Sequence, residues 1–351
     1  MDITNFFVHL DKTVNDAVKQ IDITGKKIVF IVDDNKRLVG VFTDGDMRRH
    51  ILNKGKLTDC VTEAMNQNPI CFTLENEWQI DNFWTENRLV GIPVVDHNRK
   101  VVKARFWNDE VISENLYTIP NDVPVVIMAG GKGTRLYPYT KILPKPLIPI
   151  GDLPITEHII KRFQLYGLKK FFLVINHKKA MIKAYFNEVE KSYELSFIEE
   201  EKFLGTGGGL SLLKGKISGT FFLSNCDILI DSDYECMYRH HKQYNNKITI
   251  ITAIRNMVIP YGIIEVNETG DINRMVEKPE FSYITNTGVY IIEPEVLDFI
   301  EEDKPIDLPE IAKNLLSRGE NVGIYPITEK SWLDMGQLEE MDNMLKTLKV
   351  Y

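Results

Sequence analysis

The sequence predicts an α/β protein in two parts, a small domain over residues 1–120 and a large domain over residues 121–351. A strand–turn–strand pattern occurs twice in the first 120 residues, and nearly continuous apolar strands alternate with amphipathic helices after residue 123. The composition, with 44% hydrophobic and 26% charged residues, is that of a globular chain. A length of 351 residues agrees with two domains.

The N-terminal part contains an internal repeat, with copies at about residues 1–62 and 63–118. Each copy has a helical stretch, a strand, a polar turn and a second strand. We expect the helical stretch and the two strands at 14–21, 27–33 and 35–42 in the first copy, and at 77–87, 90–96 and 98–106 in the second.

The first copy ends in a G-x-x-T-x-x-D pattern formed by Gly40, Thr43 and Asp46. This pattern resembles that of cystathionine-β-synthase (CBS) domains, which occur as tandem pairs. The resemblance implies that Asp46 binds the ribose hydroxyls of a purine nucleotide and that Thr43 helps to hold its phosphate. In residues 105–109 of the second copy we find no threonine and no matching x-x-D spacing, so we expect a single nucleotide site. A CBS pair that only assembles the protein into a homo-oligomer is an equally open interpretation.

For the second part, the sequence predicts a mixed, mostly parallel central sheet with helices on both faces, because apolar strands and amphipathic helices alternate along it. Ligands of such sheets bind beyond the carboxyl ends of the strands. The expected strands are 123–129, 171–176, 195–199 and 221–225, and the expected helices are 155–166, 178–189 and 208–213.

A glycine-rich loop follows the first of these strands. Glycines at 130, 131 and 133 allow backbone N–H groups to face a phosphate, and Arg135 and Lys145 supply positive charge on either side. The loop has neither the Gly-Lys-Ser/Thr end of a Walker A motif nor the spacing of a dinucleotide fingerprint. It predicts a phosphate site of another type.

The run from Gly130 to Pro146 resembles G-G-x-G-T-R-L-x-P-x-T-x-x-x-P-K-P, the signature of sugar-1-phosphate nucleotidyltransferases. The resemblance covers about 230 residues from Val123, the size of a large α/β domain, and implies a Rossmann-like fold. It implies that Arg135 binds the triphosphate and that Lys145 and Lys278 neutralise the reacting phosphates. The loop residues it implies for nucleotide binding are Ala129, Gly130, Gly131, Gly133 and Thr134.

Two aspartates are candidate metal ligands. Asp227 lies two residues after the apolar strand 221–225, and Asp334 lies in the segment Ser331–Gly336. In the resembled family these aspartates bind Mg²⁺, which takes one or two protein carboxylates together with phosphates and water.

The segment 199–208 resembles the family's base-binding loop, which includes Gly205 and Thr206. The residue five before its first glycine meets the edge of the base and is commonly Gln in thymidylyl- and uridylyltransferases. Here it is Glu200, and an ionised carboxylate only accepts hydrogen bonds. Guanine presents two adjacent donors, so Glu200 favours GTP. Glu199 and Glu201 flank it, and a shift of one residue would change this assignment.

Three later segments resemble the family's sugar-binding segments, with Lys278 on the sugar-1-phosphate. The implied sugar-binding residues are Tyr261, Gly262, Glu277, Asn286, Thr287 and Trp332.

We therefore expect Mg²⁺-dependent transfer of a nucleotidyl group from GTP to a hexose-1-phosphate. A CBS pair joined to such a transferase, with Glu at the base position, resembles the glucosamine-1-phosphate guanylyltransferases of bacterial legionaminic acid biosynthesis. The alternatives are a glucose-1-phosphate thymidylyl- or uridylyltransferase and a mannose-1-phosphate guanylyltransferase. A nucleotide sensor without activity is a further alternative. It is disfavoured because the charged residues of the resembled family are all present here, at Arg135, Lys145, Asp227, Lys278 and Asp334.

Composition also limits the partners. The net charge of −8 disfavours a nucleic-acid binder, and no apolar run approaches the roughly 20 residues of a membrane helix. The start, at residues 1–5, lacks the features of a signal peptide, and the four cysteines form no C-x-x-C pair. We expect a cytoplasmic protein.

Overall fold

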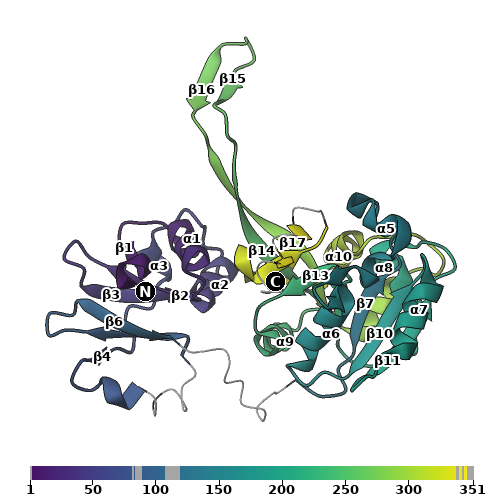
Figure 1. The fold of residues 1–351 in the computed structure, drawn as a ribbon. Coiled ribbons are helices and arrows are strands. Elements are labelled where there is room, and N and C mark those ends of the chain that lie inside the picture. The colour runs from purple at the N-terminus through teal and green to yellow at the C-terminus, as the bar shows by residue number, and fades with distance from the viewer. Residues whose placement is uncertain are drawn as a thin grey trace. The chain divides into compact units, whose positions relative to one another are not determined.

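The computed structural model describes residues 2–80, 83, 89–106, 119–336, 340–341 and 344–345 (Figure 1). The chain divides into two compact units, and each is described by itself. Unit 1 comprises Met1–Glu114, Ile254–Thr285 and Pro326–Lys330, and unit 2 comprises Asn115–Ala253, Asn286–Tyr325 and Ser331–Tyr351. The α/β class is confirmed, whereas the domain boundary near residue 120 stays a prediction.

The internal repeat is visible in unit 1 as two three-stranded sheets, ordered β1-β2-β3 and β4-β5-β6. In each sheet the first strand is parallel to the second, and the second is antiparallel to the third. The strands are β1 (Phe7–His9), β2 (Ile28–Val32), β3 (Leu38–Thr43), β4 (Phe72–Thr73), β5 (Gly91–Val95) and β6 (Val101–Phe106). The helices are η1 (Ile3–Phe6), α1 (Val14–Thr24), α2 (Asp44–Leu52), α3 (Val61–Ala64) and η2 (Glu77–Gln79).

The two copies share the chemistry of the turn between their paired strands. In the first copy Oδ1 of Asp33 accepts hydrogen bonds from the backbone N–H groups two and four residues later, at 2.9 and 2.8 Å. In the second copy Oδ1 of Asp96 accepts the equivalent pair, both at 2.8 Å. Lys36 and Arg99 take the left-handed backbone conformation at the same point of each turn. The repeat therefore extends to individual turn residues.

This equivalence corrects our interpretation of the second motif. Thr43 pairs with Ile28 in one sheet, and Phe106 pairs with Gly91 in the other, so Phe106 holds the position of Thr43. Asp109 follows Phe106 at the same spacing as Asp46 follows Thr43. The expectation that the second copy lacks the x-x-D spacing was wrong, because Asp109 keeps that spacing, while Phe106 and Lys103 stand where the first copy has Thr43 and Gly40. Asp109 itself lies outside the described residues.

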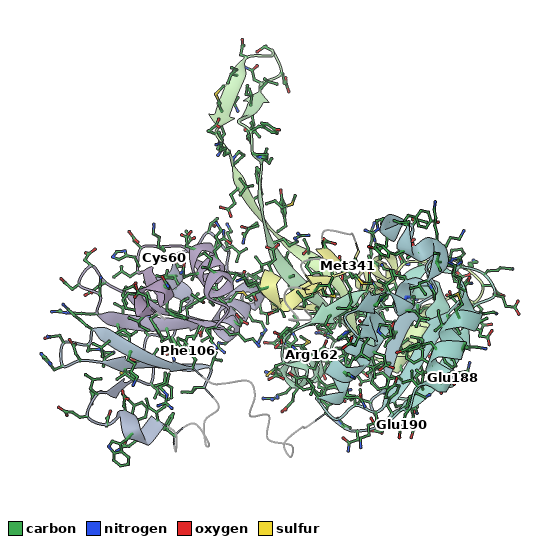
Figure 2. All side chains as sticks on the ribbon, viewed as in Figure 1. Cys60, Phe106, Arg162, Glu188, Glu190 and Met341 are labelled. Carbon is green, nitrogen blue, oxygen red and sulfur yellow. The ribbon has the colours of Figure 1, made fainter. Side chains whose placement is uncertain are left out.

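Phe106, labelled in Figure 2, occupies the position at which the first copy has the hydroxyl of Thr43. Its ring lies 4.6 Å from that of Phe6 and 6.4 Å from that of Phe30, both centroid to centroid. This aromatic cluster joins the second copy to the first through apolar contact.

Both carboxylate oxygens of Asp46 form contacts within the first copy. Its Oδ2 accepts hydrogen bonds from the backbone N–H and the hydroxyl of Thr43, at 2.9 and 2.6 Å, while its Oδ1 pairs with Arg49 at 2.5 Å. Thr43 in turn caps helix α2 by accepting from the N–H of Asp46. This is a capping box, and it is the same arrangement that Thr13 and Asp16 form at helix α1.

Unit 1 also contains a two-stranded ribbon of β15 (Ile263–Val266) and β16 (Ile272–Val276), reached through β14 (Ile248–Val258) and β17 (Glu280–Ile292). Ile264 pairs with Met275, and these side chains are 54% and 62% exposed. Glu280, the first residue of β17, forms an ion pair with Lys19 of helix α1.

Unit 2 is built on a seven-stranded sheet ordered β11-β10-β7-β12-β17-β14-β18. The first four strands are mutually parallel, and β17 runs antiparallel to β12. The new strands are β7 (Val125–Ala129), β10 (Lys170–Ile175), β11 (Glu194–Glu199), β12 (Phe221–Asn225) and β18 (Val322–Ile327). The expected mixed, mostly parallel sheet is thus confirmed.

Both faces of this sheet are covered. The ring of Phe222 lies 5.4 Å from that of Phe163 on helix α6 and 5.8 Å from that of Tyr234 on helix α9. The next residue along β12, Leu223, points to the opposite face and packs in a core cluster with Leu308 of helix α10. The helices are α5 (Tyr139–Ile142), α6 (Ile155–Gln164), α7 (Lys179–Glu188), α8 (Gly205–Gly208), α9 (Tyr234–Gln243) and α10 (Leu308–Ser317).

The remaining elements are short: β8 (Pro149–Ile150), β9 (Leu153–Pro154), β13 (Ile228–Ile230), β19 (Trp332–Asp334) and the single turns η3 (Thr134–Leu136), η4 (Lys145–Leu147), η5 (Gly209–Leu213), η6 (Pro294–Phe299) and η7 (Glu329–Ser331). None of the helices in the described part of the chain combines the length and apolar composition needed to cross a membrane.

The capping box predicts how unit 1 responds to mutation. Asp46→Ala should lower the free energy of unfolding by about 1–2 kcal/mol, because three hydrogen bonds to a buried carboxylate are lost. Arg49→Ala removes only the ion pair with an exposed guanidinium and should cost less than about 1 kcal/mol. Urea unfolding of the full chain measures both. A larger loss for Arg49→Ala than for Asp46→Ala would contradict the assignment.

Candidate active site

The glycine loop begins where β7 ends, and its backbone lies in close contact with its neighbours. Gly133 has a left-handed φ of 65°, and a Cβ there would lie 3.0 Å from Thr140 and 3.1 Å from Lys145. The hydroxyl of Thr140 donates to the carbonyl of Gly133 at 2.8 Å. A side chain at this position would therefore displace the segment that carries Lys145.

Lys178, a residue that the sequence analysis missed, anchors the same segment. Its Nζ donates to the carbonyl oxygens of Thr140, Lys141 and Ile142 at 2.9, 2.7 and 3.0 Å. These carbonyls lie at the end of the short helix α5, where backbone acceptors have no partner within the helix. Lys178 follows the end of β10, so it ties this part of the loop to the neighbouring strand.

Lys145 forms an ion pair with Asp227, and the two side chains are only 13% and 10% exposed. Burial alone would lower the pKa of Lys145, but the carboxylate of Asp227, with smaller contributions from Cys226 and Asp334, raises it above the usual value for lysine. The ammonium therefore stays charged beside the end of β12.

Asp334 is brought to Asp227 by the pairing of two short strands. Antiparallel β13 and β19 place Asp334 opposite Ile228, and the N–H of Met335 donates to the carbonyl of Asp227 at 2.9 Å. Burial raises the pKa of Asp334 to about 6, and the negative charge of Asp227 adds to this effect. Two partly buried carboxylates beside a lysine are a donor set that fits a divalent cation.

Glu200 is a buried carboxyl group at the same edge of the sheet. It is 3% exposed, its Oε1 has no hydrogen-bond partner among the described residues, and burial raises its pKa to about 7. Its backbone is fixed to the end of β10, because its N–H donates to Ile175 at 2.9 Å and its carbonyl accepts from Asn176 at 3.0 Å. Glu199, by contrast, is exposed and pairs with Lys179.

The segment Gly205–Gly208 is fixed to the start of helix α10. Both the N–H and the hydroxyl of Thr206 donate to Oδ1 of Asp307 at 3.1 Å, and the N–H groups of Gly207 and Gly208 donate to the carbonyl of Ile306. The hydroxyl of Thr206 thus serves this anchoring. Asp307 is a second positioning residue that the sequence analysis missed, since nothing in the local sequence links it to a segment about 100 residues earlier.

The remaining expected residues occupy several elements. Asn286 donates to the hydroxyl of Tyr290 at 2.6 Å, and Thr287 is buried and donates to the carbonyl of Ile251 at 2.8 Å. Trp332 lies on β19, while Thr134 and the exposed Arg135 lie on η3 after the loop. The residues Tyr261, Gly262, Glu277 and Lys278 belong to the ribbon of unit 1 or the turns at its base.

The anchoring by Lys178 is testable without an activity assay. Lys178→Met should accelerate amide hydrogen exchange in residues 130–142, because the last carbonyls of helix α5 lose three charged donors. Lys179→Met is the matched control, since its ammonium pairs only with exposed Glu199 among the described residues, and it should leave that exchange unchanged. Equal exchange in the two variants would contradict the anchoring role.

The chain is similar to known proteins in both of its parts. The profile of the "Nucleotidyl transferase" family matches residues 124–349, and that of the CBS domain matches residues 2–53. A UTP–glucose-1-phosphate uridylyltransferase of Synechocystis sp. is 30% identical over 236 residues, covering 61% of this chain and 60% of that protein. The bifunctional protein GlmU of Methanococcus maripaludis is 33% identical over 222 residues, covering 60% and 51%.

A mannose-1-phosphate guanylyltransferase catalytic subunit beta of Xenopus tropicalis is 32% identical over 220 residues, covering 60% of this chain and 61% of that protein. The chain thus spans about half to three fifths of the length of these relatives. The crystal structure of HddC from Yersinia pseudotuberculosis matches with a TM-score of 0.51 and 22% identity, over 64% of this chain and 99% of that one, which shows the fold. Because the family profile covers residues 124–349, the chain belongs to the nucleotidyl transferase family, and a CBS domain precedes that part of it.

Proposed function

We propose that the protein transfers a nucleotidyl group from a nucleoside triphosphate to a sugar-1-phosphate, giving a nucleotide-sugar and pyrophosphate. The observation that carries this proposal is the grouping of Lys145, Asp227 and Asp334 beside the glycine loop. A phosphate-binding loop, a buried ammonium and two carboxylates at one edge of a parallel sheet suit phosphoryl chemistry, which depends mainly on positioning and electrostatic stabilisation.

Mg²⁺ is the proposed metal, held by Asp227 and Asp334. Asp334 has a raised pKa because it is buried near a second carboxylate, so a divalent cation would offset the repulsion between the two. When bound, Mg²⁺ supplies neutralisation of the phosphate charge.

The chain's own residues bind and orient the reactants. A phosphate oxygen of the sugar-1-phosphate attacks the α-phosphorus, forming one P–O bond as the bond to pyrophosphate breaks. Arg135 and the amides of the glycine loop bind the triphosphate and the leaving pyrophosphate. Lys145 neutralises the α-phosphate, and Lys278 neutralises the attacking phosphate. No residue of the protein needs to form a covalent intermediate.

GTP is the proposed nucleotide, with Glu200 reading the base. Support comes from its burial and from its Oε1, which no described residue contacts by a hydrogen bond. The two adjacent donors of guanine would satisfy such a carboxylate. The relatives do not separate the bases, since a uridylyltransferase and a guanylyltransferase match almost equally well. A uridylyltransferase is therefore the second candidate.

Glucosamine-1-phosphate is the proposed sugar, and this choice depends on the resemblance of the whole chain alone. Tyr261, Gly262, Glu277, Asn286, Thr287 and Trp332 remain the proposed sugar contacts. We further propose that residues 1–120 form a CBS pair that binds a purine nucleotide or assembles the protein into a homo-oligomer.

Pyrophosphate release decides the reaction and its substrates. The full chain should release pyrophosphate with GTP and glucosamine-1-phosphate, and more slowly when UTP, dTTP, mannose-1-phosphate or glucose-1-phosphate is substituted. Nucleotide binding without pyrophosphate release from any pair would instead support a sensor.

The metal assignment predicts that Asp227→Asn keeps the fold but loses activity. The change is nearly isosteric, so the fold should be kept, but the melting temperature should fall, because buried Lys145 loses the charge of its ion-pair partner. Turnover should fall by roughly 100-fold or more, because a metal-binding carboxylate is lost. Steady-state kinetics at saturating Mg²⁺ measures this, and turnover near that of the wild type would refute the assignment.

The base assignment predicts that Glu200→Gln relaxes the preference for GTP over UTP. The amide donates to a carbonyl of uracil but loses the paired contact with guanine, which should cost the GTP reaction about 1.5–3 kcal/mol. Glu201→Gln is the matched control, because this neighbouring carboxylate is exposed. If the ratio of kcat/KM for the two nucleotides is the same in wild type and Glu200→Gln, Glu200 does not read the base.

The CBS assignment predicts one purine nucleotide site in the first 120 residues. Calorimetry of the full chain with AMP, ADP and ATP, without a sugar phosphate, should reveal it. Asp46→Asn should abolish this binding, because an amide group replaces a carboxylate oxygen that accepts from ribose. Asp16→Asn makes the same change in the other capping box and should retain it. Two sites there, or none, would leave an assembly role.

A further inference from the structure

Backbone from two segments lies against the carboxyl group of Glu200. A Cβ on Gly130, which follows β7, would lie 2.6 Å from Oε2 of Glu200. A Cβ on Gly209, in η5, would clash with Oε1 of Glu200. Asn176, after β10, lies beside Gly130. Both carboxyl oxygens therefore abut glycines, where only the missing side chains leave room for them.

None of these neighbours carries a charge, and no described side chain donates a hydrogen bond to Oε1. Gly130 and Gly209 have no side chain, and Asn176 uses its amide on the backbone carbonyl of Glu200. Burial raises the pKa of Glu200, and no charged group of the described residues contributes to this shift. An ionised carboxylate in this cradle lacks the donors that normally stabilise a buried charge.

A carboxyl group presents different hydrogen-bonding patterns in its two states. The ionised form offers two acceptors, which match the adjacent N–H donors of guanine. The protonated form offers one donor and one acceptor, which match the N3–H and O4 of uracil or thymine. One side chain can therefore complement two kinds of base, depending on whether it carries a proton.

We propose that the protein selects the base of its nucleotide through the protonation state of Glu200, with the ionised carboxylate taking guanine and the protonated carboxyl taking uracil or thymine. This inference rests on the proposed nucleotidyl transfer and deepens it. Guanine binding then releases the proton of the Glu200 carboxyl group, whereas uracil binding retains it. Because the pKa of Glu200 lies at about 7, the acid form dominates below that pH and the ionised form above it.

The test is the ratio of kcat/KM for GTP to that for UTP, measured with the full chain between about pH 6 and pH 8. Over this range the guanine-competent fraction rises about tenfold and the uracil-competent fraction falls about tenfold, so the ratio should rise roughly 100-fold. Titration of the triphosphate, the metal ligands and the sugar phosphate affects both reactions alike and cancels in the ratio.

Two variants and a binding measurement complete the design. In Glu200→Gln the ratio should not vary with pH, because an amide stays neutral, whereas Glu201→Gln should behave as the wild type. Calorimetry near pH 7, in two buffers that differ in ionisation enthalpy, should show more proton release with GTP than with UTP, and Glu200→Gln should abolish the difference.

The outcomes separate the two hypotheses. A ratio that is flat with pH in an enzyme active on GTP, or a pH-dependent ratio that persists in Glu200→Gln, would overturn the inference and leave the proposed function standing. Absence of pyrophosphate release from every nucleotide at every pH would overturn both.

Discussion

The parallel pairing of four strands is the constraint on which the candidate site depends. Ile175 at the end of β10 pairs with Glu199 of β11 on one side and with Ala129 of β7 on the other, and Asn225 of β12 pairs with Met128. All four strands therefore end at one edge within a residue or two of each other. The segments that leave this edge carry Glu200, Lys178, the glycine loop and Asp227, so groups distant in the sequence become neighbours.

Two buried carboxylates of the site, Asp227 and Glu200, differ in whether the protein supplies them with a partner. Asp227 is buried beside Lys145, so its charge has a partner within the protein. Glu200 is buried against Gly130 and Gly209, and its Oε1 has no hydrogen-bond partner in the described part of the chain. A buried charge without a partner is unfavourable in the folded protein, unless a proton or a ligand satisfies it. Asp227 therefore has its counter-charge within the protein, whereas Glu200 is suited to receive hydrogen bonds from a bound molecule.

The two copies of the N-terminal repeat show how a repeat can keep its framework while its ends diverge. The turns at Asp33 and Asp96 bind the same backbone groups, and the strands around them pair in the same register. At the position where Thr43 caps a helix, the second copy has Phe106, which packs into an aromatic cluster instead. The chemistry of each turn needs only local sequence, whereas the contacts made by the end of the strand depend on what packs against it.

The sequence by itself determined the signature loop and four of the seven strands of the large sheet, whereas β14, β17 and β18 were not predicted. Strand β12 was predicted with its bounds, and β7, β10 and β11 to within two residues, because buried apolar runs and glycine positions are local signals. Tertiary structure decided everything that depends on long-range contact. The hydrogen bonds from Lys178 to three carbonyls, those from Thr206 to Asp307 and the pairing that brings Asp334 to Asp227 all join segments that are distant in the chain. The surroundings of Glu200 likewise come from distant segments, and none of the described residues forms a hydrogen bond with its Oε1. No local pattern encodes such contacts, because they depend on the order and register of strands in the sheet, and these are fixed only when the strands pack together.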